Sequence, residues 1–140
     1  MRILVVDDEP YNRMLLQQML KPVGECDLAI DGREAVEAFM MALDEGQPYD
    51  LILLDIMMPE MNGQDALKSI RAYEQEQGVA GGNETVIFMT TALDTETQVV
   101  EAFFKGRCTD YLTKPIQREV LFDKLREYKP RHHWEPCNQD

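Results

Sequence analysis

Five side chains that could hold a metal ion or attack a phosphorus atom share one sequence feature. Each of them lies at or just after the end of a short, mostly apolar run. Three are carboxylates, one is a hydroxyl and one is an ammonium group. In chain order they are Asp7, Asp8, Asp55, Thr91 and Lys114.

Together these groups would form a site for phosphoryl chemistry. Two carboxylates about 4 Å apart repel by roughly 4 kcal/mol at an effective dielectric of 20, so three of them require a cation. Magnesium is the natural candidate because it takes oxygen ligands and leaves positions for water and phosphate. One carboxylate could then attack phosphorus, while the lysine and the hydroxyl hold the transferred group. The residue types therefore predict an acceptor of phosphate.

The surrounding sequence alternates short apolar runs with amphipathic segments, which is typical of a parallel sheet covered by helices on both faces. We predict strands at 3–6, 26–30, 51–54, 86–89 and 110–113, and helices whose apolar stripes lie within 14–20, 35–43, 66–70, 99–103 and 120–128. In such sheets ligands bind beyond the carboxyl ends of the strands. The five polar side chains are expected at that edge.

The composition fits one globular domain. The chain has 140 residues, of which 44% are hydrophobic and 29% charged. We expect the domain to cover 1–128 and to be followed by a polar tail at 129–140. With 26 acidic and 14 basic residues the net charge is −12, so nucleic acid and anionic membranes are not expected as partners.

Cellular location is predicted from three further features. No apolar run approaches the roughly 20 residues that cross a bilayer, and the N-terminus reaches acidic residues too early for a signal peptide. Cys26, Cys108 and Cys137 are odd in number and widely spaced, which argues against disulfides and a structural zinc site. We expect a cytoplasmic protein with reduced thiols.

Four motifs occur in order along the chain: VVDDEP at 5–10, LILLDIMMPEMNG at 51–63, MTTALD at 89–94 and DYLTKPI at 110–116. With them the chain resembles the receiver domains of two-component response regulators, the CheY-like family, over about residues 2–127. The resemblance implies a doubly wound α/β fold. Its five-stranded parallel sheet would have the flavodoxin-like order 2-1-3-4-5, with five helices. We expect the domain to stand alone, because 140 residues leave no space for a second domain of ordinary size.

The family also implies roles for individual residues. Asp55 would be the phosphoryl acceptor. The magnesium ligands would be Asp8, Asp55 and the backbone carbonyl of Met57, with Asp7 holding the ion through water.

Other family roles concern the phosphoryl group and the response to it. Lys114 would pair with phosphoryl oxygens and Thr91 would hydrogen-bond one of them. Tyr111 would turn inward when Thr91 moves, and Pro115 would follow a cis peptide bond. The chain departs from the family at Arg107 and Cys108, where glycine and alanine are common.

The function that this resemblance implies is a signalling switch and not a turnover enzyme. A histidine kinase or phosphotransfer protein would donate the phosphoryl group. A downstream protein would bind the fourth helix, fifth strand and fifth helix, and the domain would be a monomer or a phosphorylation-dependent dimer. Two alternatives remain open: a phosphorelay intermediate, and a magnesium-dependent aspartyl-phosphate phosphatase. The phosphatase would need a second acid two residues after Asp55, where Met57 stands.

Overall fold

The computed structural model describes residues 1–56, 62–79, 83–91 and 108–128. Its five strands form one parallel sheet in the order β2-β1-β3-β4-β5, which confirms the predicted fold class and strand order. The strands are β1 Arg2–Val6, β2 Glu25–Ala29, β3 Leu51–Asp55, β4 Val86–Thr91 and β5 Asp110–Thr113.

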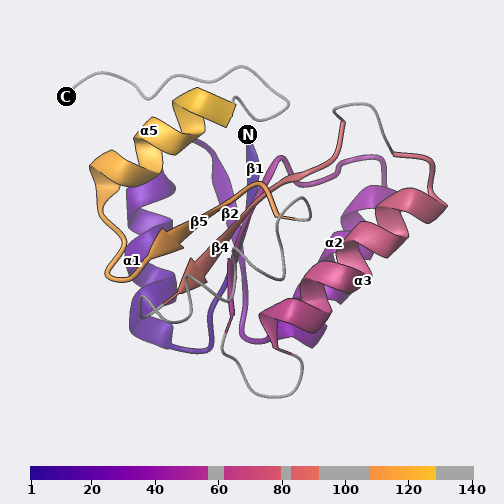
Figure 1. Ribbon diagram of the computed structural model, residues 1–140, viewed down its shortest axis with the longest axis horizontal. Coiled ribbons are helices and arrows are strands. Elements are labelled where there is room, and N and C mark those ends of the chain that lie inside the picture. The colour runs from indigo at the N-terminus through magenta and orange to yellow at the C-terminus, as the bar shows by residue number, and fades with distance from the viewer. Residues whose placement is uncertain (57–61, 80–82, 92–107, 129–140) are drawn as a thin grey trace.

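Helices cover both faces of this sheet. Helices α1 and α5 lie on one face, and α2 and α3 lie on the other (Figure 1). They span α1 Pro10–Leu20, α2 Gly32–Asp44, α3 Gly63–Glu76 and α5 Arg118–Tyr128. The predicted helix around 99–103 falls outside the described residues, as do Met57, Arg107 and the segment 129–140. Within the described ranges, no helix is long and apolar enough to cross a membrane.

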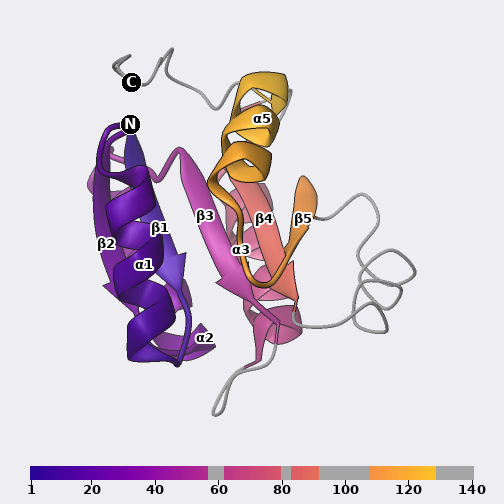
Figure 2. The ribbon, with the colours of Figure 1, turned by 90° about the vertical axis from the view of Figure 1, so that its left-hand side faces the viewer.

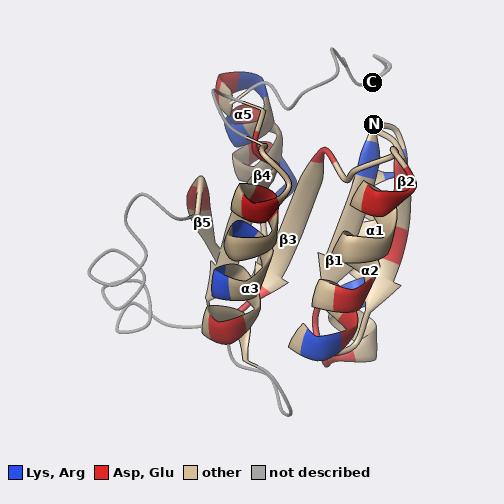
Figure 3. Ribbon diagram, turned by 90° about the vertical axis from the view of Figure 1, so that its right-hand side faces the viewer, with Lys and Arg blue, Asp and Glu red and all other residues tan. Residues whose placement is uncertain are grey.

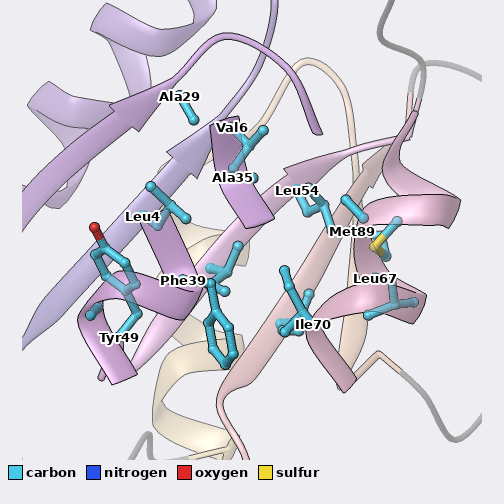
Figure 4. Close-up of a cluster of buried hydrophobic side chains, with 14 of the residues drawn as sticks. Leu4, Val6, Ala29, Ala35, Phe39, Tyr49, Leu54, Leu67, Ile70 and Met89 are labelled. Atoms are coloured by element: carbon cyan, nitrogen blue, oxygen red, sulfur yellow. The ribbon is translucent and has the colours of Figure 1, made fainter. Parts of the chain in front are cut away.

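Alternating side chains of the central strands build two hydrophobic cores. In β1, Leu4 and Val6 face the core beneath α2 and α3, where they join Phe39 (Figure 4). Ile3 and Val5 face the second core, beneath α1 and α5. Fully burying one such side chain stabilises the fold by roughly 1.5–3 kcal/mol. Because both faces are covered, β1 and β3 are apolar at nearly every position, as the sequence predicted.

Local side-chain contacts fix where the helices begin. Asp31 precedes α2 and its carboxylate accepts a hydrogen bond from the Glu34 backbone N–H at 2.9 Å. Asn62 precedes α3 and accepts from the Asp65 N–H at 3.0 Å in the same way. Such caps satisfy N–H groups that the helix itself leaves without partners. Figure 3 shows that α2 and α3 each carry acidic as well as basic residues, so neither forms a basic stripe.

Candidate functional site

Parallel pairing brings the ends of four strands to one edge of the sheet. The arrowheads of β1 and β3 point to the same lower edge in Figure 2. Asp55 ends β3 and is in register with Thr90 of β4, while Thr91 is in register with Thr113 of β5. Asp7 directly follows β1, and Lys114 directly follows β5. The sequence-predicted acids, hydroxyl and ammonium therefore gather where parallel sheets bind ligands.

Three carboxylates form the centre of this site. One oxygen from each of Asp7, Asp8 and Asp55 lies within 4.8 Å of the other two. Asp7 is 1% and Asp55 4% exposed, whereas Asp8 is exposed to solvent. Two of the three charges are thus held in a poorly hydrated place, where their repulsion is stronger than in water.

Lys114 supplies positive charge to the two buried carboxylates. Its Nζ lies 3.2 Å from Asp7 Oδ2 and 3.2 Å from Asp55 Oδ1. Burial lowers the pKa of Lys114, but the carboxylates of Asp55 and Asp7 outweigh that effect and raise this pKa above its ordinary value. The ammonium is consequently charged at neutral pH, and it can pair with an anion that arrives at Asp55.

The backbone around Lys114 holds that ammonium in place. The peptide bond between Lys114 and Pro115 is cis, as the family resemblance implied. The Lys114 N–H donates to the Thr91 carbonyl at 2.6 Å, which joins the turn after β5 to the end of β4. This backbone hydrogen bond therefore fixes the position of Lys114 relative to Thr91.

Gly63 brings the start of α3 close to the end of β3. A Cβ atom at this position would lie 2.3 Å from the Asp55 carbonyl oxygen and 2.8 Å from the Ile56 Cα. The Gly63 N–H donates to the Ile56 carbonyl at 2.9 Å. Only glycine permits this approach, so it also limits how the Asp55 backbone can move.

The predicted switch residues lie on neighbouring strands. Thr91 is fully buried at the end of β4. Tyr111 of β5 is in register with Met89, two positions before Thr91, and it is half-buried against the core beneath α2 and α3. The Lys124 Nζ lies 6.0 Å from the centroid of the Tyr111 ring. Cys108, at one of the departures from the family, is half-buried, and burial raises its thiol pKa.

The acidic residues fit a hard divalent cation. Asp7 Oδ2 is buried and, apart from its ion pair with Lys114, accepts no hydrogen bond within the described part of the chain. Lys114 offsets part of this charge, but one ammonium does not balance three carboxylates, so the cluster as a whole still favours a cation. The cluster offers only carboxylate oxygens. Magnesium prefers oxygen ligands, whereas zinc sites are usually built from nitrogen and sulfur ligands.

Sequence reasoning missed one residue at this edge. Arg13 of α1 donates from a guanidinium nitrogen to the Asp7 backbone carbonyl at 2.6 Å. In the sequence it is an ordinary polar position of an amphipathic helix. Its place in the first turn of the helix that follows Asp7 and Asp8 is the signal that could have drawn attention to it.

A cleft of about 1240 Å³ lies away from these carboxylates, at the amino ends of β1 and β2. It is lined by Arg2, Lys21 and Asp27 among others. A second cleft, of about 420 Å³, runs along β5 and includes Lys114. Charge and convergence, and not cavity size, identify the candidate site.

Family comparison gives a match over most of the chain. The family model of the response regulator receiver domain matches residues 3–126. Among curated proteins, the sensory/regulatory protein RpfC of Xanthomonas campestris pv. campestris is 32% identical over 127 residues. That alignment covers 91% of this chain and 16% of RpfC, so the chain spans a small part of that relative's length.

Two solved structures are similar in fold. A co-crystal structure of the Saccharomyces cerevisiae phosphotransfer protein Ypd1 with the receiver domain of Ssk1 matches with a TM-score of 0.74 and 30% identity. The match covers 91% of this chain and 88% of that one. The CheX-CheY-BeF₃-Mg complex of Borrelia burgdorferi matches with a TM-score of 0.75 and 25% identity, covering 93% and 90%.

Proposed function

Because the chain belongs to the response regulator receiver domain family of two-component signalling, we propose that it accepts a phosphoryl group on Asp55. The donor would be a phosphohistidine of a histidine kinase or of a histidine phosphotransfer protein. One observation carries this proposal: the buried Asp55 carboxylate lies 3.2 Å from the Lys114 ammonium and within 4.8 Å of two further carboxylates. Aspartate so placed can act as a nucleophile toward phosphorus.

The proposed step transfers phosphorus from nitrogen to oxygen. A carboxylate oxygen of Asp55 forms a bond to phosphorus, and the bond from phosphorus to the imidazole nitrogen breaks. The electron pair of that bond stays with the nitrogen, which takes up a proton. Lys114 pairs with the phosphoryl oxygens and the Thr91 hydroxyl bonds one of them, so charge that develops during transfer is stabilised.

A divalent cation completes the proposed site. We assign it to Asp8, Asp55 and the backbone carbonyl of Met57, with Asp7 holding it through water. A bound Mg²⁺ would offset the repulsion between these carboxylates and an incoming phosphoryl group. Lys114 holds the Asp7 and Asp55 carboxylates beside each other, which supports their proposed place at this site.

The consequence of phosphorylation would be a change in partner binding. We propose that the new charge at Asp55 acts through Thr91 and Tyr111 on the fourth helix, β5 and α5, where a downstream protein binds. The domain would catalyse only its own phosphorylation and dephosphorylation, and would be a monomer or a phosphorylation-dependent dimer.

We place this activity in the cytoplasm, a compartment that suits the free thiols of Cys26 and Cys108.

Intact-mass measurement tests the acceptor directly. The protein is incubated with acetyl phosphate and MgCl₂ and compared with Asp55→Asn. Asp123→Asn is the matched control because Asp123 is an exposed aspartate on α5. We expect one phosphoryl adduct on the wild type and on Asp123→Asn, and none on Asp55→Asn or in the presence of a magnesium chelator.

Two other results would count against the proposal. An adduct that persists in Asp55→Asn would place the acceptor elsewhere. Absence of any adduct, together with failure to bind beryllofluoride as a phosphoryl mimic, would mean that the fold works without phosphorylation. Multiple turnover of a phosphate monoester would instead support the phosphatase alternative.

A further inference from the structure

We propose that Arg13 is a positioning residue for the metal site. By holding the backbone carbonyl of Asp7, it would orient the peptide that carries Asp8 and so aim the Asp8 carboxylate at the cation. This inference rests on the proposed function, because it assumes that the acidic cluster binds Mg²⁺.

The contact itself is short and partly shielded from water. Arg13 NH1 donates to the Asp7 carbonyl oxygen at 2.6 Å. Arg13 is half-buried near the start of α1, and its own N–H donates to the Glu9 carbonyl at 3.1 Å. The helix therefore holds the base of the side chain, and a charged donor meets the carbonyl, which makes the bond stronger than one between neutral groups.

The other polar atoms of Asp7 are also held. Its N–H donates to the Ala29 carbonyl at 3.2 Å, and Oδ1 accepts from the Glu9 N–H at 2.9 Å. Oδ2 lies 3.2 Å from the Lys114 Nζ. With those atoms fixed, the remaining freedom at this point is rotation of the peptide between Asp7 and Asp8.

That rotation decides where the Asp8 side chain points. A peptide unit is planar, so the direction of the Asp7 carbonyl fixes the plane that also contains the Asp8 nitrogen and Cα. Asp8 itself is exposed, so packing does little to hold it. The bond from Arg13 is then the contact that selects one peptide orientation, and with it the position of a proposed magnesium ligand.

Two effects of Arg13 on metal binding have opposite signs. As a cation near the cluster, the guanidinium repels Mg²⁺, so removing its charge should strengthen binding. As a positioning group it strengthens binding, so removing it should weaken binding. Because residues that orient metal ligands typically change metal affinity 10–100-fold, we expect positioning to dominate.

A magnesium titration distinguishes the two effects, with the Kd for Mg²⁺ obtained from the changes in amide NMR chemical shifts. Wild type, Arg13→Met and Arg13→Lys are titrated with MgCl₂ at constant ionic strength. Arg126→Met is the matched control, since it removes the same charge from an exposed α5 side chain that pairs only with Asp123 among the contacts described. We expect the Kd for Mg²⁺ to rise about ten-fold in Arg13→Met. Arg13→Lys, which keeps one charged donor, should recover part of this loss, and Arg126→Met should match wild type.

A second measurement separates positioning from a general loss of structure. At Mg²⁺ concentrations well above the raised Kd, Arg13→Met should regain the wild-type rate of phosphorylation by acetyl phosphate, because the intact ligands are then filled. A rate that stays low at saturating Mg²⁺ would overturn the positioning role. If Arg13→Met does not fold, Arg13→Gln is titrated in its place, with the same weakening expected.

The possible failures are distinguishable. An unchanged or lower Kd in Arg13→Met, with normal binding by wild type, would overturn this inference and leave the proposed function intact. Absence of Mg²⁺ binding by wild type would overturn both. Absence of an adduct on a wild type that binds Mg²⁺ would contradict the proposed function alone.

Discussion

Lys114 stands between two buried carboxylates, and the charge balance of the site depends on it. Its Nζ is 3.2 Å from both Asp7 Oδ2 and Asp55 Oδ1. In Lys114→Met, both acids lose this counter-charge in a place that water reaches poorly. Removing one partner of a buried ion pair costs up to 3–5 kcal/mol, and since Lys114 is partly exposed we expect a loss of about 1–3 kcal/mol in metal-free protein.

Urea unfolding in EDTA measures this loss. Lys21→Met is the control because Lys21 is exposed at the end of α1. Equal free energies of unfolding for the two variants would show that the Lys114 ion pairs add no stability. A lower free energy of unfolding in Lys114→Met alone would confirm that its ammonium stabilises the fold by offsetting the charges of Asp7 and Asp55.

Gly63 gives a second prediction for a single residue. An added methyl group would overlap the Asp55 carbonyl oxygen, which is backbone and cannot easily move aside. We expect Gly63→Ala to lower the free energy of unfolding by about 2–3 kcal/mol. Gly78 is the comparison: its φ of +77° strains any side chain, but no atom lies within 4 Å of the added Cβ. Gly78→Ala should cost about 1 kcal/mol by urea unfolding, and an equal loss in both would contradict the steric argument.

Among the elements, β5 and α5 are joined by one carboxylate. Asp110 accepts from the Lys124 Nζ at 2.9 Å and from the Tyr128 hydroxyl at 2.8 Å. The bond to Asp110 is the main reason that the pKa of Tyr128 is raised to about 12. The Tyr128 ring also meets Phe88 edge to face, with centroids 5.8 Å apart. Tyr128→Phe keeps the ring contact and removes only the hydroxyl.

This substitution gives a pH-dependent prediction for the two elements. A raised folded-state pKa means that the hydroxyl stabilises the protein fully below its ordinary pKa near 10 and loses that effect as pH rises toward 12. At pH 7 we expect Tyr128→Phe to be less stable than wild type by about 0.5–1 kcal/mol, because the pair is partly exposed. Urea unfolding between pH 7 and 11 should show this difference shrinking above pH 10; a constant difference would contradict it.

Strands and helices could be predicted from the sequence where a local pattern of apolar residues defines them. The apolar runs of β1, β3 and β4 identified these strands and placed the acids and Thr91 at their ends. The edge strand β2 was predicted one residue late, at 26–30 instead of Glu25–Ala29, because one half-exposed strand has a weaker apolar pattern. The bonds of Arg13 and Tyr128 were not predicted. Arg13 bonds a backbone carbonyl, which no residue type in the sequence marks, and Tyr128 bonds a carboxylate that the fold brings near it.

For the whole molecule, the site lies where four strands of the sheet end, with Thr91 at the end of β4. Asp7 and Asp8 follow β1, Asp55 ends β3 and Lys114 follows β5. A ligand bound to all of them contacts the sheet across its width and is absent from the unfolded chain. Such a ligand stabilises the folded state by RT ln(1 + [L]/Kd), which is about 2.7 kcal/mol at one hundred times Kd.

Thermal unfolding therefore tests the site as a property of the entire domain. With MgCl₂ held constant and beryllofluoride near one hundred times its Kd, we expect beryllofluoride to raise the wild-type Tm by roughly 8 °C for a domain of this size. Asp55→Asn lacks the carboxylate to which the phosphoryl mimic would bind, so its beryllofluoride response should vanish, while Asp123→Asn should respond as wild type does. The same beryllofluoride shift in Asp55→Asn would show that the anion binds elsewhere.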